Sequence, residues 1–419
     1  MAQLAPADID LSNHDLFVDH APHEVFDVLR EHAPVHWNPE PAPRSGFWSI
    51  TRYDDIVRIL KDTATFSSEE RGITLEDPTP DELDVRRNML ELDPPRHARW
   101  RKVLAPDFTP RAVGRWEEWL RGLTLRVLDD ALPKGEFDFV DDIAAPIPIR
   151  VLGHILGVPE EHHDRLIELS DKLINNNDPE LASVTADSPE SDAYRLAPFR
   201  SPDAQEIIDL GHDLFDARRK QAQDDVMSLL VHASPEGGPY TQRELDVNFV
   251  TLVVAGNETT RSAMAHGMLA LIDSPEQYAL LREQPELIPQ AVDEMIRVAS
   301  PVWHFRRTAT TDVELHGQTI HAGDKVVVWF ASANYDPAVF PDPHRFDVTR
   351  PPSRNLHAAF GRGGPHFCLG AHLAALEVRV LLEEFVPRVQ SIELAGPPRR
   401  VRSNFANGLK AMPVRVTLG

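Results

Sequence analysis

The chain has 419 residues, of which 42% are hydrophobic and 26% are charged, values typical of a globular protein that can bury a large core. Its 66 acidic and 43 basic residues give a net charge of −23, which argues against nucleic acid or an anionic membrane as a partner of the whole molecule. The single cysteine excludes an intramolecular disulfide bond. Residues 1–30 do not resemble a signal peptide, and the apolar runs are too short to insert stably in a membrane. We therefore expect a cytoplasmic protein.

The first hundred residues contain short elements. We expect a flexible arm at 1–13, two helices at 22–32 and 54–61, and two short strands at 35–37 and 47–50, where apolar and polar residues alternate. Residues 67–92 are charged and contain several prolines, which predicts a long loop. Such loops often carry function, and a solvated surface loop is the alternative.

A basic motif follows, Asp93-Pro94-Pro95-Arg96-His97-Ala98-Arg99-Trp100-Arg101. The prolines suit the start of a helix, and His97 and Arg101 are four residues apart, so they point to the same side. Arg and His side chains are good hydrogen-bond donors to carboxylates. The pair is either an anion-binding site or a solvated basic face.

The middle of the chain is predicted to be helical. The predicted helix at 141–156 is interrupted by Pro146 and Pro148. A polar, proline-rich connection at 179–202 lies between the predicted helices at 159–174 and 204–223. The predicted helices span residues 109–132, 141–156, 159–174 and 204–223.

A long helix is predicted from a capping box, Thr241 and Glu244, to Asp273, where Ser274-Pro275 ends it. At 1.5 Å per residue it is about 50 Å long and crosses the molecule. Its middle reads Ala255-Gly256-Asn257-Glu258-Thr259-Thr260, and an interior glycine costs about 1 kcal/mol relative to alanine. This local defect indicates a functional site, with a helix kink around a buried, hydrogen-bonded glutamate as the alternative.

The last third combines strands, at 309–315 and 326–330, with two short motifs. Glu294-Met295-Ile296-Arg297 places an acid and a base on one helix face, and Phe340-Pro341-Asp342-Pro343-His344-Arg345-Phe346 follows. Alone, each of these motifs is a weak signal.

The only cysteine, Cys368, lies in a loop, Phe360-Gly361-Arg362-Gly363-Gly364-Pro365-His366-Phe367-Cys368-Leu369-Gly370, ahead of a predicted helix at 371–386. Unpaired N–H groups and the helix dipole at such a position favour a thiolate, which acts as a nucleophile or a metal ligand. A buried hydrophobic cysteine is the common alternative. A dinucleotide loop is disfavoured because no strand precedes it, and zinc held with His366 and His372 is disfavoured because there is no second cysteine.

In this order the motifs resemble those of the cytochrome P-450 superfamily of haem-thiolate monooxygenases, in its soluble bacterial type, over nearly the whole chain. The resemblance implies a mainly helical fold with a minor β region, one domain over residues 1–419, and haem between the long central helix and the helix after Cys368. In this family the cysteine thiolate is the axial ligand of the haem iron. Phe360 lies eight residues before Cys368, where the family pattern has seven.

The resemblance implies a role for each motif. Thr259 is expected to steady bound O2 and Glu258 to take part in proton delivery. The other expected contacts of the cofactor, heme b, are His97, Arg101, Arg307, His366, Ala255, Gly256, Phe360 and Gly370. Arg306 is an alternative to Arg307 as a haem contact, because spacing alone does not distinguish two neighbouring residues. The expected substrate pocket contains Ile73, Leu75, Thr251, Val254, Val302, Trp303 and Ala406. Glu294, Arg297 and Arg345 are expected to form a buried structural ion-pair network.

The implied reaction is insertion of one oxygen atom of O2 into a C–H bond of a small apolar substrate. The particular residues of the motifs suggest a terpenoid, a sterol side chain or a branched lipid. Electrons from NAD(P)H are expected through a separate ferredoxin and ferredoxin reductase, docking near Arg99, Lys102, Arg111 and Arg362. Two alternatives stay open, a haem-thiolate enzyme that uses peroxide and a non-catalytic haem sensor or binding protein.

Overall fold

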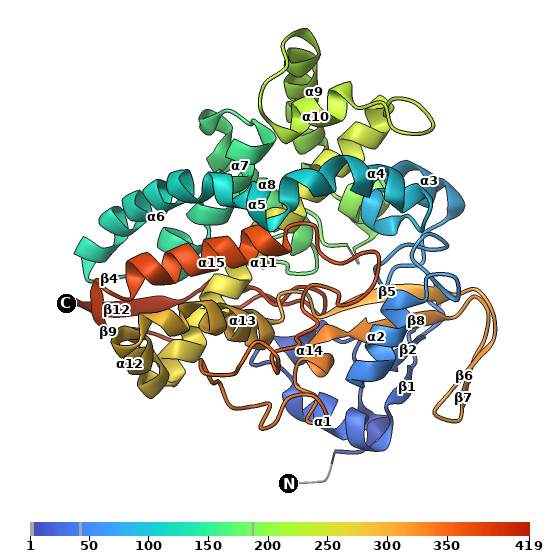
Figure 1. Cartoon of the computed structure of the whole chain (residues 1–419). Helices are drawn as coiled ribbons and strands as arrows, with labels where there is room; N and C mark the ends of the chain where they lie inside the picture. The colour runs from blue at the N-terminus through green and yellow to red at the C-terminus, as the bar shows by residue number, and fades with distance from the viewer. Residues whose placement is uncertain (1–3, 42–43, 187) are drawn as a thin grey trace.

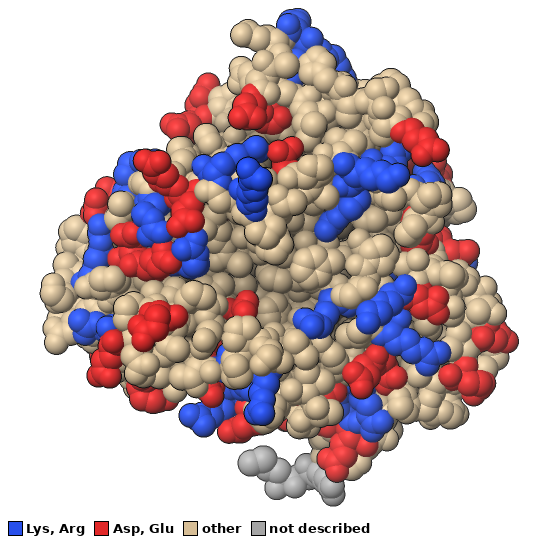
Figure 2. All heavy atoms as spheres, viewed as in Figure 1, with Lys and Arg blue, Asp and Glu red and all other residues tan. Residues whose placement is uncertain are grey.

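The computed structural model describes residues 4–41, 44–186 and 188–419. Helices occupy most of the molecule, and the largest sheet lies at one corner of a roughly triangular outline (Figures 1 and 2). The helices are α1 (His23–His32), α2 (Tyr53–Lys61), α3 (Pro80–Arg86), α4 (Arg96–Leu104), α5 (Pro110–Val113), α6 (Glu117–Ala131), α7 (Pro146–Leu156), α8 (His163–Ile174), α9 (Asp203–Lys220), α10 (Val226–His232), α11 (Gln242–Asp273), α12 (Pro275–Glu283), α13 (Ile288–Ala299), α14 (Phe330–Ala333) and α15 (Ala371–Phe385).

The strands form a five-stranded sheet in the order β1-β2-β8-β5-β3 and three smaller sheets, β4-β12-β9, β6-β7 and β10-β11. The pairing of β2 with β8 is parallel, and the other strand pairings in these sheets are antiparallel among the described residues. The strands are β1 (Val35–Asn38), β2 (Phe47–Ile50), β3 (Phe66–Ser67), β4 (Glu136–Asp138), β5 (His304–Ala309), β6 (Val313–Leu315), β7 (Gln318–Ile320), β8 (Lys325–Trp329), β9 (Val389–Leu394), β10 (Arg399–Arg400), β11 (Leu409–Ala411) and β12 (Pro413–Leu418).

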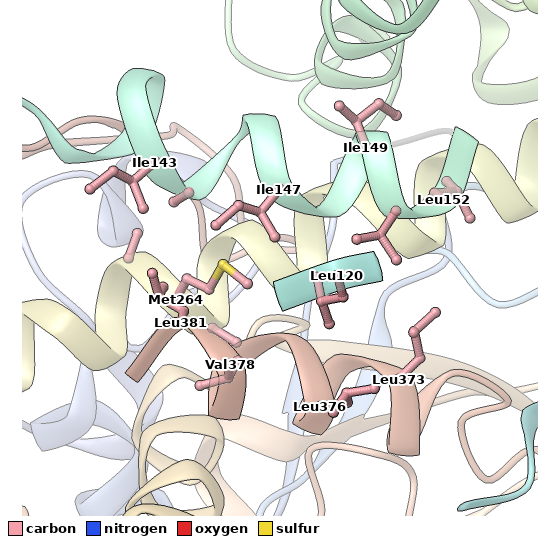
Figure 3. Packing of buried hydrophobic residues seen from close by; sticks show 14 of the residues in the cluster. Leu120, Ile143, Ile147, Ile149, Leu152, Met264, Leu373, Leu376, Val378 and Leu381 are labelled. Carbon is pink, nitrogen blue, oxygen red and sulfur yellow. The ribbon is translucent and has the colours of Figure 1, made fainter. Parts of the chain in front are cut away.

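The main core lies where α6, α7, α11 and α15 meet (Figure 3). Leu120 of α6, Ile147 of α7, Met264 of α11, and Val378 and Leu381 of α15 are all fully buried there. Burial of each such side chain contributes about 1.5–3 kcal/mol. The core therefore holds α11 and α15 against each other, and these are the helices that carry the predicted site.

The central helix has the predicted ends. The Thr241 hydroxyl accepts from the Glu244 N–H, the Glu244 carboxylate accepts from the Thr241 N–H, and α11 runs to Asp273 before Ser274 and Pro275 begin α12. The expected break in the 141–156 helix is also present. A π-helical turn at Val140–Ala144 precedes α7, and Pro146 stands in the first turn of α7.

Several expectations were wrong. Residues 4–13 are not an exposed arm, because Ile9 and Leu11 are buried and the Leu11 N–H donates to Asn38 Oδ1 at 2.7 Å; residues 1–3 lie outside the described part. The strand expected at 309–315 is two strands, since β5 ends at Ala309 and a turn precedes β6.

The expected helix at 109–132 is likewise interrupted by a 3₁₀ turn, Gly114–Trp116, between α5 and α6. The expected loop at 67–92 contains α3, which is capped by Thr79 and Glu82. Its polar composition concealed that capping box.

Candidate active site

One side of α11 is accessible although the helix crosses the middle of the molecule (Figure 1). Leu252, Ala255, Gly256 and Thr259 keep accessible surface, and Ala255 is exposed, whereas the flanking residues are buried. These four residues are spaced by three, one and three, so they share one helix face. This face borders space inside the fold that a ligand can fill.

The local defect in α11 has the predicted hydrogen bond. The Thr259 hydroxyl donates to the Ala255 carbonyl oxygen at 2.7 Å, one turn back. A Cβ at Gly256 would lie 3.0 Å from the Leu152 side chain, so glycine allows α7 to pack closely on α11 at this point. The small residues of this turn thus leave room on the accessible side of α11 and allow α7 to pack closely on the other side.

Glu258 is buried beside the accessible face and belongs to a charged chain. Its carboxylate lies 2.5 Å from Arg261 Nη2, and Arg261 Nη1 donates to Asp171 of α8 at 2.6 Å. Burial raises the pKa of Glu258 to about 8, because it outweighs the opposing charge of Arg261. A carboxyl group in this environment holds a proton at neutral pH and can donate it.

The loop before α15 is shaped by its glycines. Gly361 and Gly363 have positive φ angles, and the Cys368 N–H donates to the Phe360 carbonyl oxygen at 2.8 Å. A Cβ at Gly364 would lie 2.2 Å from the Leu60 carbonyl oxygen, so this loop packs directly on the end of α2. The longer spacing between Phe360 and Cys368 is therefore accommodated against α2.

The expected influence of the helix start on Cys368 is present but opposed. Burial raises the pKa of the thiol, although a hydrogen bond from the Gly370 N–H and the charge of Arg101 act in the opposite direction. A bound metal ion would reverse this balance, because a coordinating thiol loses its proton.

Four basic side chains gather beside this loop. His97 Nε2 lies 3.1 Å from the Pro365 carbonyl oxygen, Arg101 Nη2 donates to the Phe367 carbonyl oxygen at 2.6 Å, and the His97 and His366 rings are 4.2 Å apart. Burial, followed by the charges of Arg307, His97 and Arg101, lowers the pKa of His366 to about 2. The cluster is therefore suited to an anion.

Arg306 and Arg307 have different environments. Arg306 donates to the Glu76 carbonyl oxygen and lies 3.3 Å from Asp77 Oδ1. Arg307 donates from Nη1 to the Arg306 carbonyl oxygen at 2.8 Å. The buried Nε of each arginine lacks a hydrogen-bond partner among the described residues, but only Arg306 lies beside a carboxylate within ion-pair distance there. Arg307 is thus the one of the two that remains available to a ligand.

These features fit a haem. The buried Nδ1 and Nε2 of His366 and Nε of Arg307 lack partners in the described part of the chain, and two propionates would supply acceptors. A Cβ at Gly370 would have no described atom within 4 Å, which leaves room beside Cys368. Within the described ranges no group of three or more His, Cys, Asp or Glu could hold a metal ion.

The predicted structural network has a different third member. Arg297 donates to both carboxylate oxygens of Glu294 at 2.8 Å, as expected, but it is Arg350 Nε that donates to Glu294, at 3.0 Å. Arg345 is exposed, and only its carbonyl oxygen faces the guanidinium groups of Arg297 and Arg350. The assignment of Arg345 to the network was wrong, because the turn at 341–350 directs its side chain outward.

The residues expected in the substrate pocket divide into two groups. Val302 is partly accessible and pairs with Ala406, and Leu75 is also partly accessible, so these remain candidates. The others are buried: Ile73, Thr251, Val254, Ala406 and Trp303. Trp303 packs against Phe17 at 5.5 Å, in the core below the sheet, so it does not face the accessible side of α11.

Phe305 was missed, and Phe405 lies beside it. Both rings are partly accessible and lie 5.8 Å apart. Phe305 is two residues before Arg307 on β5, and alternate residues of a strand share a face. The sequence therefore held a signal for Phe305, whereas the position of Phe405 depends on the C-terminal segment folding back to Trp303, whose N–H donates to the Phe405 carbonyl oxygen.

Comparison with known proteins decides the family. A family model described as "Cytochrome P450" matches residues 17–394. The chain belongs to the cytochrome P450 family. P450 enzymes carry haem and use O2, and the chain is a monooxygenase.

Several relatives of this P450 are named monooxygenases or hydroxylases. The chain is 38% identical to linalool 8-monooxygenase of Pseudomonas putida, over 97% of this chain and 98% of that protein. It is 37% identical to methyl-branched lipid omega-hydroxylase of Mycobacterium tuberculosis, over 97% and 94%. It is 33% identical to steroid C26-monooxygenase of Mycolicibacterium smegmatis, over 98% and 94%.

Solved structures agree. A cytochrome P450 from Mycobacterium marinum in complex with pseudoionone matches with a TM-score of 0.86 and 35% identity, over 94% of each chain. A P450 from Novosphingobium aromaticivorans matches with a TM-score of 0.84 and 33% identity, over 99% and 98%. Of the described helices in the present chain, none is long and apolar enough to cross a bilayer.

The packing of Gly364 gives a first prediction. We expect Gly364→Ala to destabilise the protein by about 3 kcal/mol, because the new Cβ meets the backbone of Leu60, which cannot move aside. Chemical denaturation with haem absorption as the signal measures this change. Gly114→Ala is the matched control, since a Cβ there meets no described atom within 4 Å. Equal stability of the two variants would contradict the packing of the loop on α2.

Proposed function

We propose that Cys368 is the axial ligand of the haem iron in this P450 and that His97, Arg101, Arg307 and His366 hold the propionates. The observation that carries this proposal is the set of buried, unpartnered nitrogens of His366 and Arg307, next to the only cysteine. When bound, haem supplies the activation of O2 and the oxidation of the C–H bond. Ala255, Gly256, Phe360 and Gly370 would contribute the walls.

In the same proposal, residues of α11 control the protons that the reaction needs. The Thr259 hydroxyl lies on the accessible face, and Glu258 is the next residue, buried and with a raised pKa. Glu258 would release a proton toward the cavity, and the Arg261 guanidinium, which Asp171 also holds, would position its carboxyl group. Thr259 would hold the hydrogen-bonding position at the end of this route.

The proposed substrate is a small, largely aliphatic molecule such as a terpenoid, a sterol side chain or a branched lipid. Leu252, Val302, Phe305 and Phe405 give the accessible side of the cavity an apolar lining. The relatives named above act on linalool, steroids and methyl-branched lipids. Screening these three classes by the ferric spin-state shift tests the proposal, and product formed under isotopically labelled O2 should carry one labelled oxygen.

We propose further that electrons from NAD(P)H arrive through a ferredoxin and its reductase. Figure 2 shows Lys and Arg side chains, near α4 and near the end of α2, on either side of a largely uncharged hollow. Lys102 and Arg111 are exposed, Arg362 is partly exposed, and none of them has an ion pair among the described residues. Arg99 pairs with Glu244 at 2.6 Å, so it is engaged within the protein.

Charge reversal tests this docking face. We expect Lys102→Glu combined with Arg362→Glu to slow reduction by a ferredoxin at least about tenfold at low ionic strength, because these charges steer an acidic partner. Stopped-flow reduction kinetics measure the effect. Lys220→Glu is the control, since Lys220 is exposed at the end of α9, away from this face. Unchanged kinetics in the double variant would place the docking site elsewhere.

A further inference from the structure

A second cavity, of about 590 Å³, lies beside the apolar side of the candidate site. Several segments far apart in the chain line it, namely the N-terminal segment, residues 74–78, the end of α8, residues 188–200, the start of β5 and the C-terminal segment containing Phe405. Its wall contains polar residues, such as Asn176, Asn404 and His304.

His304 is the unusual group in this wall. It is only 1% exposed, and within the described part of the chain neither ring nitrogen has a hydrogen-bond partner. Aromatic rings flank it, Trp329 at 4.7 Å and Phe405 at 5.5 Å. A buried donor or acceptor without a partner is costly, so a polar group that reaches His304 gains a hydrogen bond otherwise absent from the protein.

The charges of the wall are neutralised within the protein. Arg200 pairs with Glu82 at 3.1 Å and with Asp192, while Asp77 lies 2.7 Å from Lys325 and 3.3 Å from Arg306. Burial lowers the pKa of His304 to about 3, so the imidazole is neutral, with one nitrogen that donates and one that accepts. A neutral oxygen group fits this wall better than a carboxylate.

The Phe405 ring lies between this cavity and the apolar side of the candidate site. It contacts His304 on one side and lies 5.8 Å from Phe305, which shares a strand face with Arg307. The next residue, Ala406, pairs with Val302. A molecule that reaches from α11 to His304 would therefore pass Phe405.

We propose that His304 is a specificity-determining residue that binds a hydroxyl or keto oxygen at the end of the substrate remote from the reacting C–H bond. The enzyme would then take substrates that already carry one neutral oxygen group and oxidise them at the opposite, hydrocarbon end. This inference rests on the proposed function and narrows its substrate class.

The test uses the ferric holoenzyme and three ligands with one carbon skeleton: geraniol, the corresponding hydrocarbon without the hydroxyl group, and geranic acid. Spin-state titrations give the Kd of each ligand for the wild type, His304→Phe and His304→Gln. We expect the preference for the alcohol over the hydrocarbon to fall about tenfold in His304→Phe, which keeps an aromatic ring but loses the hydrogen bond. His304→Gln should retain most of the preference, and geranic acid should bind most weakly to the wild type.

An equal preference in the wild type and His304→Phe would overturn the subsite, as would tighter binding of geranic acid than of geraniol. If the hydrocarbon binds and substitution of His304 does not change the ligand preference, the subsite alone is overturned and the proposed function still stands. Failure of all three ligands to bind a protein with intact thiolate-ligated haem would overturn the subsite for small terpenoids and remove terpenoids from the proposed substrate class.

Discussion

Arg350→Ala should lower the free energy of unfolding by about 3–5 kcal/mol, whereas Arg345→Ala should change it by less than about 0.5 kcal/mol. Arg350 is 7% exposed and donates to Glu294, which is fully buried together with Arg297. Removing one guanidinium leaves the Glu294 carboxylate with less charge compensation in a fully buried site. Arg350 also donates to the carbonyl oxygens of Pro341 and Arg345, so its loss frees the turn at 341–350.

Denaturant unfolding of the two purified holoproteins measures the difference. Arg345→Ala is a matched control, because it removes the same kind of side chain from the same turn while keeping the carbonyl oxygen that Arg297 and Arg350 use. If Arg350→Ala does not accumulate, Arg350→Lys replaces it, and we expect partial loss because Lys cannot reproduce the guanidinium geometry. A larger effect at Arg345 than at Arg350 would restore the sequence-based assignment and contradict the structure.

Glu258→Gln should reduce the rate of product formation about 10²-fold with little change in the Kd of the substrate. The amide keeps the size of the side chain and cannot release the proton. Since the pKa of Glu258 is raised to about 8, the carboxyl is protonated and able to donate below that pH, and the wild-type rate should fall as the pH rises through about 8. The variant should lose this pH dependence along with the rate.

Product formation under saturating electron donor, measured across this pH range, tests the role of Glu258. Glu258→Asp is the matched control, because it keeps a carboxyl group one methylene shorter and should retain more activity than Glu258→Gln. The same pH profile in the wild type and Glu258→Gln, or an unchanged rate, would remove Glu258 from the proton route and leave it as the partner of Arg261.

Local chemistry explains what could be predicted from the sequence. The ends of α11 follow from the capping box of Thr241 and Glu244 and from Ser274-Pro275, which are signals within a few residues of the ends that they define. The placement of His97 and Arg101 on one side of α4 follows from the helical repeat, and both reach the loop that carries Cys368.

The errors concern residues whose positions depend on distant parts of the chain. Arg345 and Arg350 stand in one irregular turn, and no repeat in the sequence tells which side chain points inward. The raised pKa of the Cys368 thiol comes from its desolvation in the folded loop, which the charges near the loop do not reveal. The residues next to His304 in the sequence are typical of a buried strand. The proposed role of His304 depends on segments that meet only in the folded chain.

The most direct test of the account is the absorption spectrum of the reduced protein under carbon monoxide, recorded for the wild type and for Cys368→Ala. If Cys368 is the axial ligand, the wild type shows a strongly red-shifted Soret band that is lost in the variant, because thiolate ligation gives the haem this spectrum. A histidine-type spectrum in the wild type, or a red-shifted band that survives in Cys368→Ala, would contradict the assignment of Cys368 as the axial ligand.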